Sequence, residues 1–188
     1  ANPPVGGVQL DTDDDGKGDI CEECPNDANP GDQGCPISVV TIKTDPAVTA
    51  EQRRVHVEDM VVTAVGSNGF WSQLDPATPG YTSVNDTCIF SFVGAAAKPA
   101  IGDKVDIDGT ASLFFEQAQL GSLTFTVQAS NVPVAPTVIE DANIVDAVAD
   151  GARSPIEGCL IQLTNAEVIN AAPDAGAGDS GNPRNEFE

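Results

Sequence analysis

The stretch from Ile101 to Phe115, IGDKVDIDGTASLFF, decides the fold class, because apolar and polar residues alternate along it. Successive side chains of a β-strand point to opposite faces of its sheet, so alternation predicts a half-buried strand. The expected apolar face comprises every second residue from Val105 to Phe115, and the expected solvated face comprises Asp106, Asp108, Thr110 and Ser112. We assign Asp103, Asp106 and Asp108 to a charged outer surface rather than to a second metal site.

The same period of two continues in both directions over most of residues 55–134. Asn68-Gly69 predicts a hairpin turn between a long first strand and a second strand at Phe70 to Asp75. The other expected strands carry their apolar residues as follows: Val55, Val57, Val61, Thr63 and Val65 in the first, Cys88, Phe90 and Phe92 in the third, and Leu123, Phe125 and Val127 in the fifth. Five strands in this order predict an all-β fold, a small Greek-key barrel.

Two motifs in this region resemble those of OB-fold modules found beside secreted bacterial nucleases. A strand ending in a G-F-x-x-Q-D-like turn corresponds to residues 69–75, and V-G-D-x-V-x-V-x-G corresponds to residues 101–109, with the usual continuation at 114–120. The resemblance covers residues 54–135 and implies a five-stranded OB-like barrel.

Residues 11–22, DTDDDGKGDICE, place oxygen donors at loop positions 1, 3, 5, 9 and 12 and a glycine, Gly16, at position 6. Calcium takes six to eight oxygen ligands, and this spacing allows one short segment to wrap around it. The predicted cofactor is therefore Ca²⁺, bound by side-chain oxygens or, for the lysine, a carbonyl: Asp11, Asp13, Asp15, Lys17, Asp19 and Glu22.

Prolines and glycines on both sides of this loop exclude the flanking helices of an EF-hand. The run from Asp11 through Cys24-Pro25 to Asn29-Pro30 instead resembles a thrombospondin type-3 repeat, with Glu22 in place of the usual aspartate. The resemblance covers about residues 8–36 and implies calcium-dependent, extracellular structure and no catalysis.

Five cysteines, three of them within residues 21–35, indicate an oxidising compartment. Zinc bound by Cys21-x2-Cys24 is the alternative, but the second close pair of ligands that a zinc knuckle needs is missing. We therefore favour disulfides, with Cys24 paired to Cys35 and Cys88 to Cys159. Cys21 is then unpaired or forms an intermolecular bridge.

The chain has 188 residues, with 29 acidic and 8 basic side chains and a net charge of −21. Such a chain repels phosphate backbones and anionic membrane surfaces, so we expect no nucleic-acid partner and no membrane insertion. No apolar run reaches the roughly 18 residues of a membrane span. The chain begins at Ala1, without a signal peptide, and we interpret it as the mature form of an exported protein, extracellular or at the cell surface.

No motif for nucleophilic, phosphate-binding or metalloprotease chemistry occurs, so we expect no enzyme activity. His56, the sole histidine, lies in an expected strand and is interpreted as a strand residue. Trp71 and Tyr81 are a possible interface, because the basic residues that single-strand nucleic-acid binding needs are absent around them.

Four segments follow from these assignments: a calcium module at 1–36, a linker or docking strand at 37–53, the barrel at 54–135 and an extension at 136–188. The run Ile37–Ile42 is the expected docking strand, and a strand at about 158–169 is expected to pair with the barrel or with a neighbouring subunit.

The sequence thus predicts a non-enzymatic, calcium-binding structural protein that self-associates into an oligomer or fibre, such as a filament on a cell surface. Strand addition and a disulfide would join the subunits. An accessory, substrate-positioning module of a larger secreted nuclease or hydrolase is the alternative. A glycan- or protein-binding adhesin is the second alternative.

Overall fold

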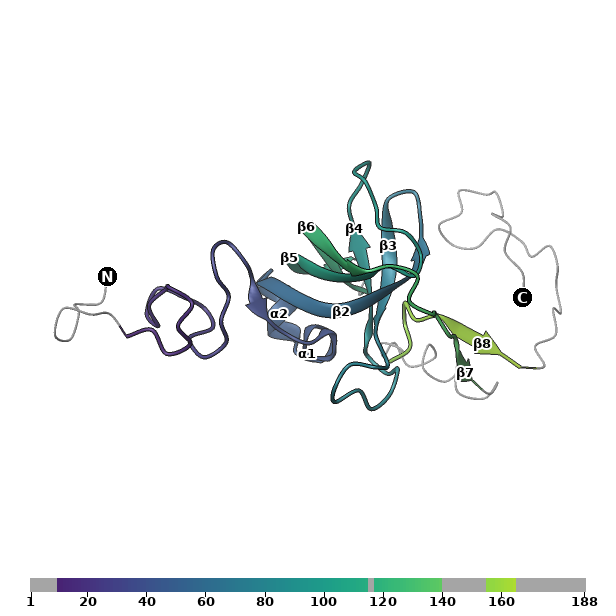
Figure 1. Cartoon of the computed structure of the whole chain (residues 1–188), viewed down its shortest axis with the longest axis horizontal. Coiled ribbons are helices and arrows are strands. Elements are labelled where there is room, and N and C mark those ends of the chain that lie inside the picture. The colour runs from purple at the N-terminus through teal and green to yellow at the C-terminus, as the bar shows by residue number, and fades with distance from the viewer. Residues whose placement is uncertain (1–9, 115–116, 140–154, 165–188) are drawn as a thin grey trace.

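The computed structural model describes residues 10–114, 117–139 and 155–164, and strands dominate it (Figure 1). Two short helices lie between the first two strands. The elements are β1 (Cys35–Pro36), α1 (Val39–Thr44), α2 (Pro46–Ala50), β2 (Arg54–Val65), β3 (Gly69–Leu74), β4 (Cys88–Phe92), β5 (Lys104–Phe114), β6 (Gln117–Ala129), β7 (Thr137–Ile139) and β8 (Ile161–Leu163). Neither helix is long and apolar enough to cross a membrane, as far as the described residues extend.

Six strands form one mixed sheet in the order β1-β2-β3-β4-β6-β5, and β2 also pairs with β5. The strand pairings therefore form a closed ring, from β2 through β3, β4, β6 and β5 back to β2. β1 with β2 and β4 with β6 are parallel, while the other neighbours in this sheet are antiparallel. This strand-dominated arrangement agrees with the all-β class expected from the alternation, whereas the OB-like barrel stays a prediction and is argued below.

The core is almost entirely aliphatic and is built from strands of this sheet together with α1 and α2. Phe70 is its largest fully buried side chain, and its ring meets that of Phe125 edge-on at a centroid distance of 5.8 Å. The alternation in β5 holds as far as Ala111, after which Leu113 is 47% exposed. Phe115, the last residue of the expected apolar face, lies outside the described residues.

In β2 Val61 and Thr63 are buried as expected, at 3% and 7% exposed, but beyond Val57 the predicted single apolar face is wrong. Val55 and Val57 are buried in the core as expected, but the pairing with β5 shifts register between Val57 and Met60. Asp59 adopts a φ of 60° within this bulge. One extra residue shifts the alternation, so Met60 and Val62 enter the core cluster, and a second register shift follows between Val62 and Ala64 in the pairing with β3. Val65, expected inside, is 42% exposed.

The strand expected at Ile37–Ile42 is also wrong, because α1 covers Val39–Thr44 and so takes up most of this run. The hydroxyl of Ser38 accepts a hydrogen bond from Thr41 N at 3.1 Å, which caps the first turn. Asp45 caps α2 in the same way, accepting from Ala47 N at 3.0 Å, and a proline follows it at the first helical position. Local capping and burial of Ile42 in the core outweigh the strand preference of a β-branched run.

Within the strand expected at 158–169, the described residues form β8 at Ile161–Leu163, and its pairing with a neighbouring subunit stays a prediction. β8 pairs in parallel with β7, with Thr137 opposite Ile161, rather than with the six-stranded sheet. Residues 165–169 lie outside the described part of the chain. A disulfide between Cys159 and Cys88, the first residue of β4, ties this segment to the larger sheet. The second disulfide joins Cys24 and Cys35, so both bonds are the pairs favoured from the sequence.

The bulge in β2 carries an ion-pair cluster that makes stability depend on pH. Lys104 Nζ lies 2.6 Å from Asp59 Oδ1 and 3.3 Å from Asp75 Oδ2, and Thr78 Oγ1 donates to Asp59 Oδ2 at 3.1 Å. The hydrogen bond from Lys104 lowers the pKa of Asp59 below its usual 3.8, and the same bond raises the pKa of Lys104 above 10.5.

We expect Asp59→Asn to destabilise the fold at pH 7 by at most about 1 kcal/mol, because the pair is partly exposed. Asn tolerates a positive φ as Asp does, so the substitution should leave the backbone conformation at residue 59 unchanged. A carboxyl group whose pKa is lower in the folded than in the unfolded state stabilises the fold at pH values above its unfolded pKa. That contribution is lost as the pH falls through the folded-state pKa. Urea melts should therefore converge for the two proteins in strong acid. A difference that persists unchanged there would contradict the assignment.

Candidate metal centre

The segment from Leu10 to Gly34 lies at one end of the molecule, ahead of the sheet (Figure 1). Carboxylates of this loop hydrogen-bond to backbone N–H groups a few residues further on, which folds it tightly. Asp11 Oδ2 accepts from Gly16 N at 3.0 Å and Asp15 Oδ1 from Lys17 N at 2.7 Å. Gly16 has a φ of 93°, a conformation that favours glycine, as the loop pattern requires.

This folding gathers three of the predicted ligands. One carboxylate oxygen from each of Asp11, Asp13 and Asp15 lies within 4.8 Å of the other two. Asp11 Oδ1, Asp13 Oδ2 and both carboxylate oxygens of Glu22 are shielded from solvent and have no hydrogen-bond partner within the described structure. Buried carboxylate oxygens without donors are costly, and a bound cation is the simplest way to satisfy them.

The electrostatics of the loop also favour a cation. Loss of hydration raises the pKa of Asp13, and the neighbouring charges of Asp15 and Asp11 add to this effect. The pKa of Glu22 is raised by desolvation and then by the carboxylates of Asp13, Asp15, Asp11 and Asp19. The loop thus holds negative charges that repel one another, and a divalent ion would relieve that repulsion.

Asp15 is the most firmly held member of the cluster. Its side chain is 0% exposed, and Oδ2 accepts a hydrogen bond from Asn29 N at 3.0 Å. The ammonium group of Lys17 lies 3.9 Å from the same carboxylate and donates to the carbonyl of Asn29. Asn29, which is 6% exposed, was not predicted as part of the site, although the Asn-Pro pair of the repeat pattern marked its position.

The structure places Asp19 differently from the other predicted side-chain ligands. Its two carboxylate oxygens accept hydrogen bonds from Thr12 N and Thr12 Oγ1, both at 2.8 Å. Asp19 is therefore engaged beside the three-aspartate cluster, and a direct contact with the ion stays a prediction. Loop position 9 of calcium loops frequently reaches the ion through water, which is compatible with this placement.

Oxygen ligands alone suit calcium or magnesium better than zinc. The zinc alternative needed Cys24 as a thiolate, and the disulfide with Cys35 uses that sulfur. Cys21 is exposed and belongs to neither disulfide.

A continuous set of contacts joins the loop to the sheet. Asn29 Nδ2 donates to Gln33 O at 3.2 Å, and the side-chain amide nitrogen of Gln33 lies 3.1 Å from His56 Nε2 in β2. Gly34 N donates to Asp108 Oδ2 in β5 at 2.9 Å. His56 is 9% exposed, so the sole histidine belongs to the junction between the loop and the sheet.

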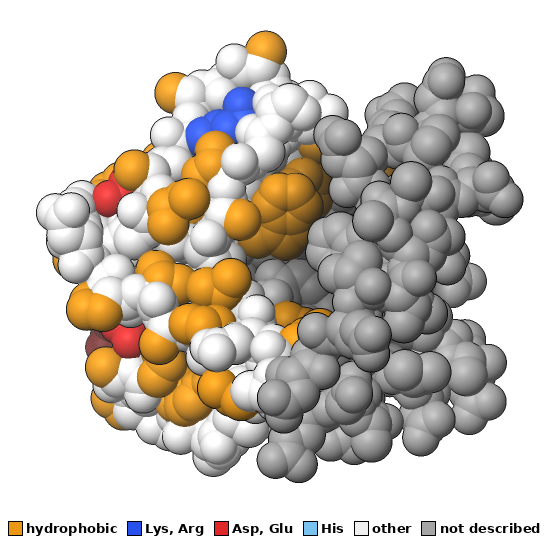
Figure 2. Space-filling view, turned by 90° about the vertical axis from the view of Figure 1, so that its right-hand side faces the viewer, with side chains coloured by type: hydrophobic (Ala, Val, Ile, Leu, Met, Phe, Trp, Pro, Cys, Tyr) orange, Lys and Arg blue, Asp and Glu red, His pale blue; other side chains and the backbone are white. Residues whose placement is uncertain are grey.

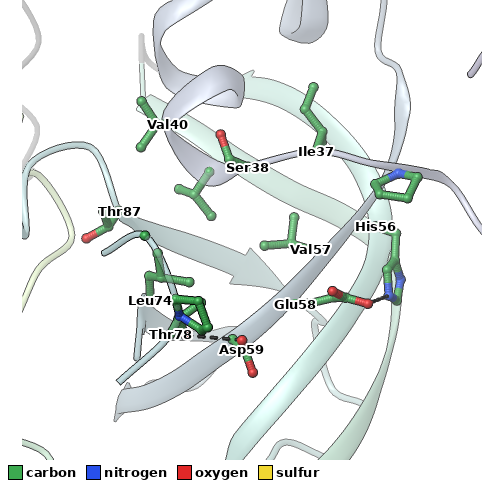
Figure 3. Close-up of a pocket in the computed structure, with 14 residues that line it drawn as sticks. Ile37, Ser38, Val40, His56, Val57, Glu58, Asp59, Leu74, Thr78 and Thr87 are labelled. Atoms are coloured by element: carbon green, nitrogen blue, oxygen red, sulfur yellow. Dashed lines mark hydrogen bonds and ion pairs between the residues drawn. The ribbon is translucent and has the colours of Figure 1, made fainter. Parts of the chain in front are cut away.

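A hollow of about 460 Å³ lies beside this junction, between the start of α1, β2 and the segment after β3 (Figure 3). Its polar groups are already engaged. Ser38 caps α1, Asp59 is bound to Thr78 and Lys104, and His56 lies 3.5 Å from Glu58 Oε1. We assign no ligand to this hollow.

The two predicted interface aromatics do not share a site. Trp71 packs against Phe90 on the outer face of the large sheet, with ring centroids 4.7 Å apart. Tyr81 lies in the loop between β3 and β4 and is not part of the hollow that Trp71 lines.

Comparison with known proteins finds no family model that matches the chain, no similar curated protein and no similar solved structure.

Proposed function

We propose that this chain is a calcium-binding structural module of an exported protein. The observation that carries the proposal is the set of buried carboxylate oxygens without donors on Asp11, Asp13 and Glu22, next to the buried carboxylate of Asp15. Calcium is the ion of choice because the loop offers oxygen ligands at the spacing of a twelve-residue calcium loop. Catalysis is not part of the proposal.

Isothermal titration calorimetry of chelator-stripped protein tests this proposal. Calcium should bind at one site with measurable heat, and magnesium should bind more weakly, because it demands a stricter octahedral geometry and keeps its water shell. Absence of heat with both ions would contradict a metal site in this loop.

We further propose that β2 to β6 form an OB-like, five-stranded barrel. Two features support this assignment: the ring of pairings from β2 through β3, β4, β6 and β5 back to β2, and the parallel contact of β4 with β6. A closed ring leaves few free strand edges, which protects this part of the chain from unwanted strand pairing.

The two disulfides indicate an oxidising environment. Together with the large negative charge and the calcium loop, they support our proposal that the protein works outside the cell or on its surface, where calcium is abundant.

Self-association is the remaining part of the proposal. β7 and β8 pair only with each other among the described residues, and a parallel pair of three-residue strands is marginal alone. Exposed Val138 and Leu163 in these strands add apolar surface, which a strand from a second copy would cover.

We expect multi-angle light scattering to show oligomers or fibres in calcium and a shift toward monomers after chelation with EDTA. Cys21→Ser should leave calcium binding intact and weaken any covalent assembly, which non-reducing electrophoresis would reveal. A monomer both with and without calcium, at concentrations up to the solubility limit, would refute self-association while leaving the calcium site in place.

A further inference from the structure

The outer face of the large sheet carries an aromatic groove of about 410 Å³, and none of its lining residues belongs to the calcium loop. Its aromatic lining comes from three strands: Trp71 in β3, Phe90 and Phe92 in β4, and Phe114 at the end of β5. Hydrophobic side chains gather on the side of the molecule that Figure 2 presents, with few charged side chains among them. The volume lies within the range of about 300–1,000 Å³ that is common for ligand clefts.

Strand register builds the floor of this groove. Trp71 is directly opposite Phe90 across the β3–β4 pair, and Phe90 is opposite Gln119 across the β4–β6 pair. Residues opposite one another on neighbouring strands point to the same face of a sheet. The side chains of Trp71, Phe90 and Gln119 therefore form a row across this face. Gly66 leaves space for the Trp71 ring, since a Cβ at residue 66 would lie only 3.1 Å from it.

Amide side chains supply the polar part of the lining. They are Asn68, Gln117 and Gln119. Gln119 Nε2 contacts Ser112 Oγ at 3.5 Å, whereas the side chains of Asn68 and Gln117 make no hydrogen bond within the described structure. As far as the described residues show, these two amides therefore keep donors and acceptors that a ligand could use.

No charged residue lines the described groove, although the chain carries a net charge of −21. A phosphate-bearing ligand would find no Lys or Arg here, and the overall charge would repel it. A cationic ligand would find no carboxylate in the groove. The aromatic rings form an open row, so they do not enclose a cation as an aromatic cage does. The lining fits a ligand that is uncharged, flat on one side and rich in hydroxyl groups.

From this arrangement we infer that the groove binds a neutral saccharide. The C–H face of a pyranose ring stacks on Trp71 and Phe90, and its hydroxyl groups exchange hydrogen bonds with the amides of Gln117 and Gln119. This inference is independent of the calcium proposal, because no groove residue belongs to the calcium loop.

Trp71 is the single tryptophan of the chain, so all tryptophan fluorescence comes from a residue that lines the groove. The full chain is titrated with cellohexaose, maltohexaose and mannohexaose as neutral probes. We expect at least one of them to change the emission saturably, with a dissociation constant in the micromolar to millimolar range. A thymidine decanucleotide and tetramethylammonium chloride serve as the charged comparisons.

Two variants test the assigned contacts while keeping the reporter. Phe90→Ala and Gln117→Ala should each weaken binding about tenfold, the equivalent of one lost stacking or hydrogen-bonding contact. Tyr81→Ala, an aromatic change outside the groove, should leave binding unchanged. Thermal melts identify any variant that fails to fold, and Gln117, a half-buried residue at the start of β6, carries less of that risk.

Failure of all three saccharides to alter the emission would overturn the inference. It would also be overturned if only the oligonucleotide or the ammonium ion bound, or if Tyr81→Ala weakened binding as much as Phe90→Ala. Repeating the titration in EDTA should give the same affinity, since the groove does not use the ion.

Discussion

Saturating calcium should raise the melting temperature of this protein by about 5–10 °C. A ligand that binds only the folded state, present at 100 times its dissociation constant, stabilises by about 2.7 kcal/mol. For a chain of this length each kcal/mol corresponds to roughly 2–4 °C. The effect should reach the whole fold, because β1 pairs with β2 and Gly34 bonds to Asp108, which join the loop to the sheet. Scanning calorimetry with calcium or EDTA measures it.

Glu22→Gln provides the decisive variant for this result. It removes the carboxylate expected to bind the ion through two oxygens, both of which are buried without donors. If affinity falls about 100-fold, the same calcium concentration stabilises by only about 0.4 kcal/mol, which is roughly 1–2 °C.

Glu23→Gln is the matched control, because it makes the same chemical change at the next residue, which is exposed and outside the cluster. It should melt like the parent protein in both buffers. Equal calcium shifts in Glu22→Gln and Glu23→Gln would show that the ion, if bound, is held elsewhere.

Phe70→Ala should lower the free energy of unfolding by about 3–5 kcal/mol, the usual cost of truncating a buried phenylalanine. Phe70 is 0% exposed, lies in the core cluster and contacts the ring of Phe125. Truncation removes apolar burial and leaves a cavity that the surrounding strands, held by their pairings, are poorly able to fill. Urea unfolding followed by circular dichroism gives the value.

Phe92→Ala offers the contrasting truncation on the neighbouring strand. Phe92 is 46% exposed, so its loss should cost at most about 1 kcal/mol. Comparable costs for the two variants would show that the core is not centred on Phe70 as described.

The parts of the fold that depend on local chemistry were predictable from the sequence. Alternation in β5 identifies a strand because side-chain direction repeats every two residues. Asn68-Gly69 marked the hairpin between β2 and β3, although the connection covers residues 66–68 and Gly69 already begins β3. The spacing of Asp11, Asp13 and Asp15 identified the cluster in the same way, since loop geometry follows from spacing and a glycine.

What could not be predicted depends on tertiary contacts. The bulge at Asp59 inserts one residue into β2, and nothing in an alternating sequence marks where such a shift falls. Residues 39–44 and 46–50 form α1 and α2, whose Ile42 and Val48 join the core cluster, a contact that a window of neighbouring residues does not reveal. Asn29 likewise enters the site through a contact 14 residues away from Asp15.

The bond between Cys88 and Cys159 closes a loop whose ends are 71 residues apart, and that loop includes β5, β6 and β7. Tension applied to the two ends of the chain would pass directly through the sulfur atoms and bypass this loop. Those strands would stay unstretched as long as the bond stays oxidised, so a chain in a pulled fibre could elongate only through the segments outside the loop.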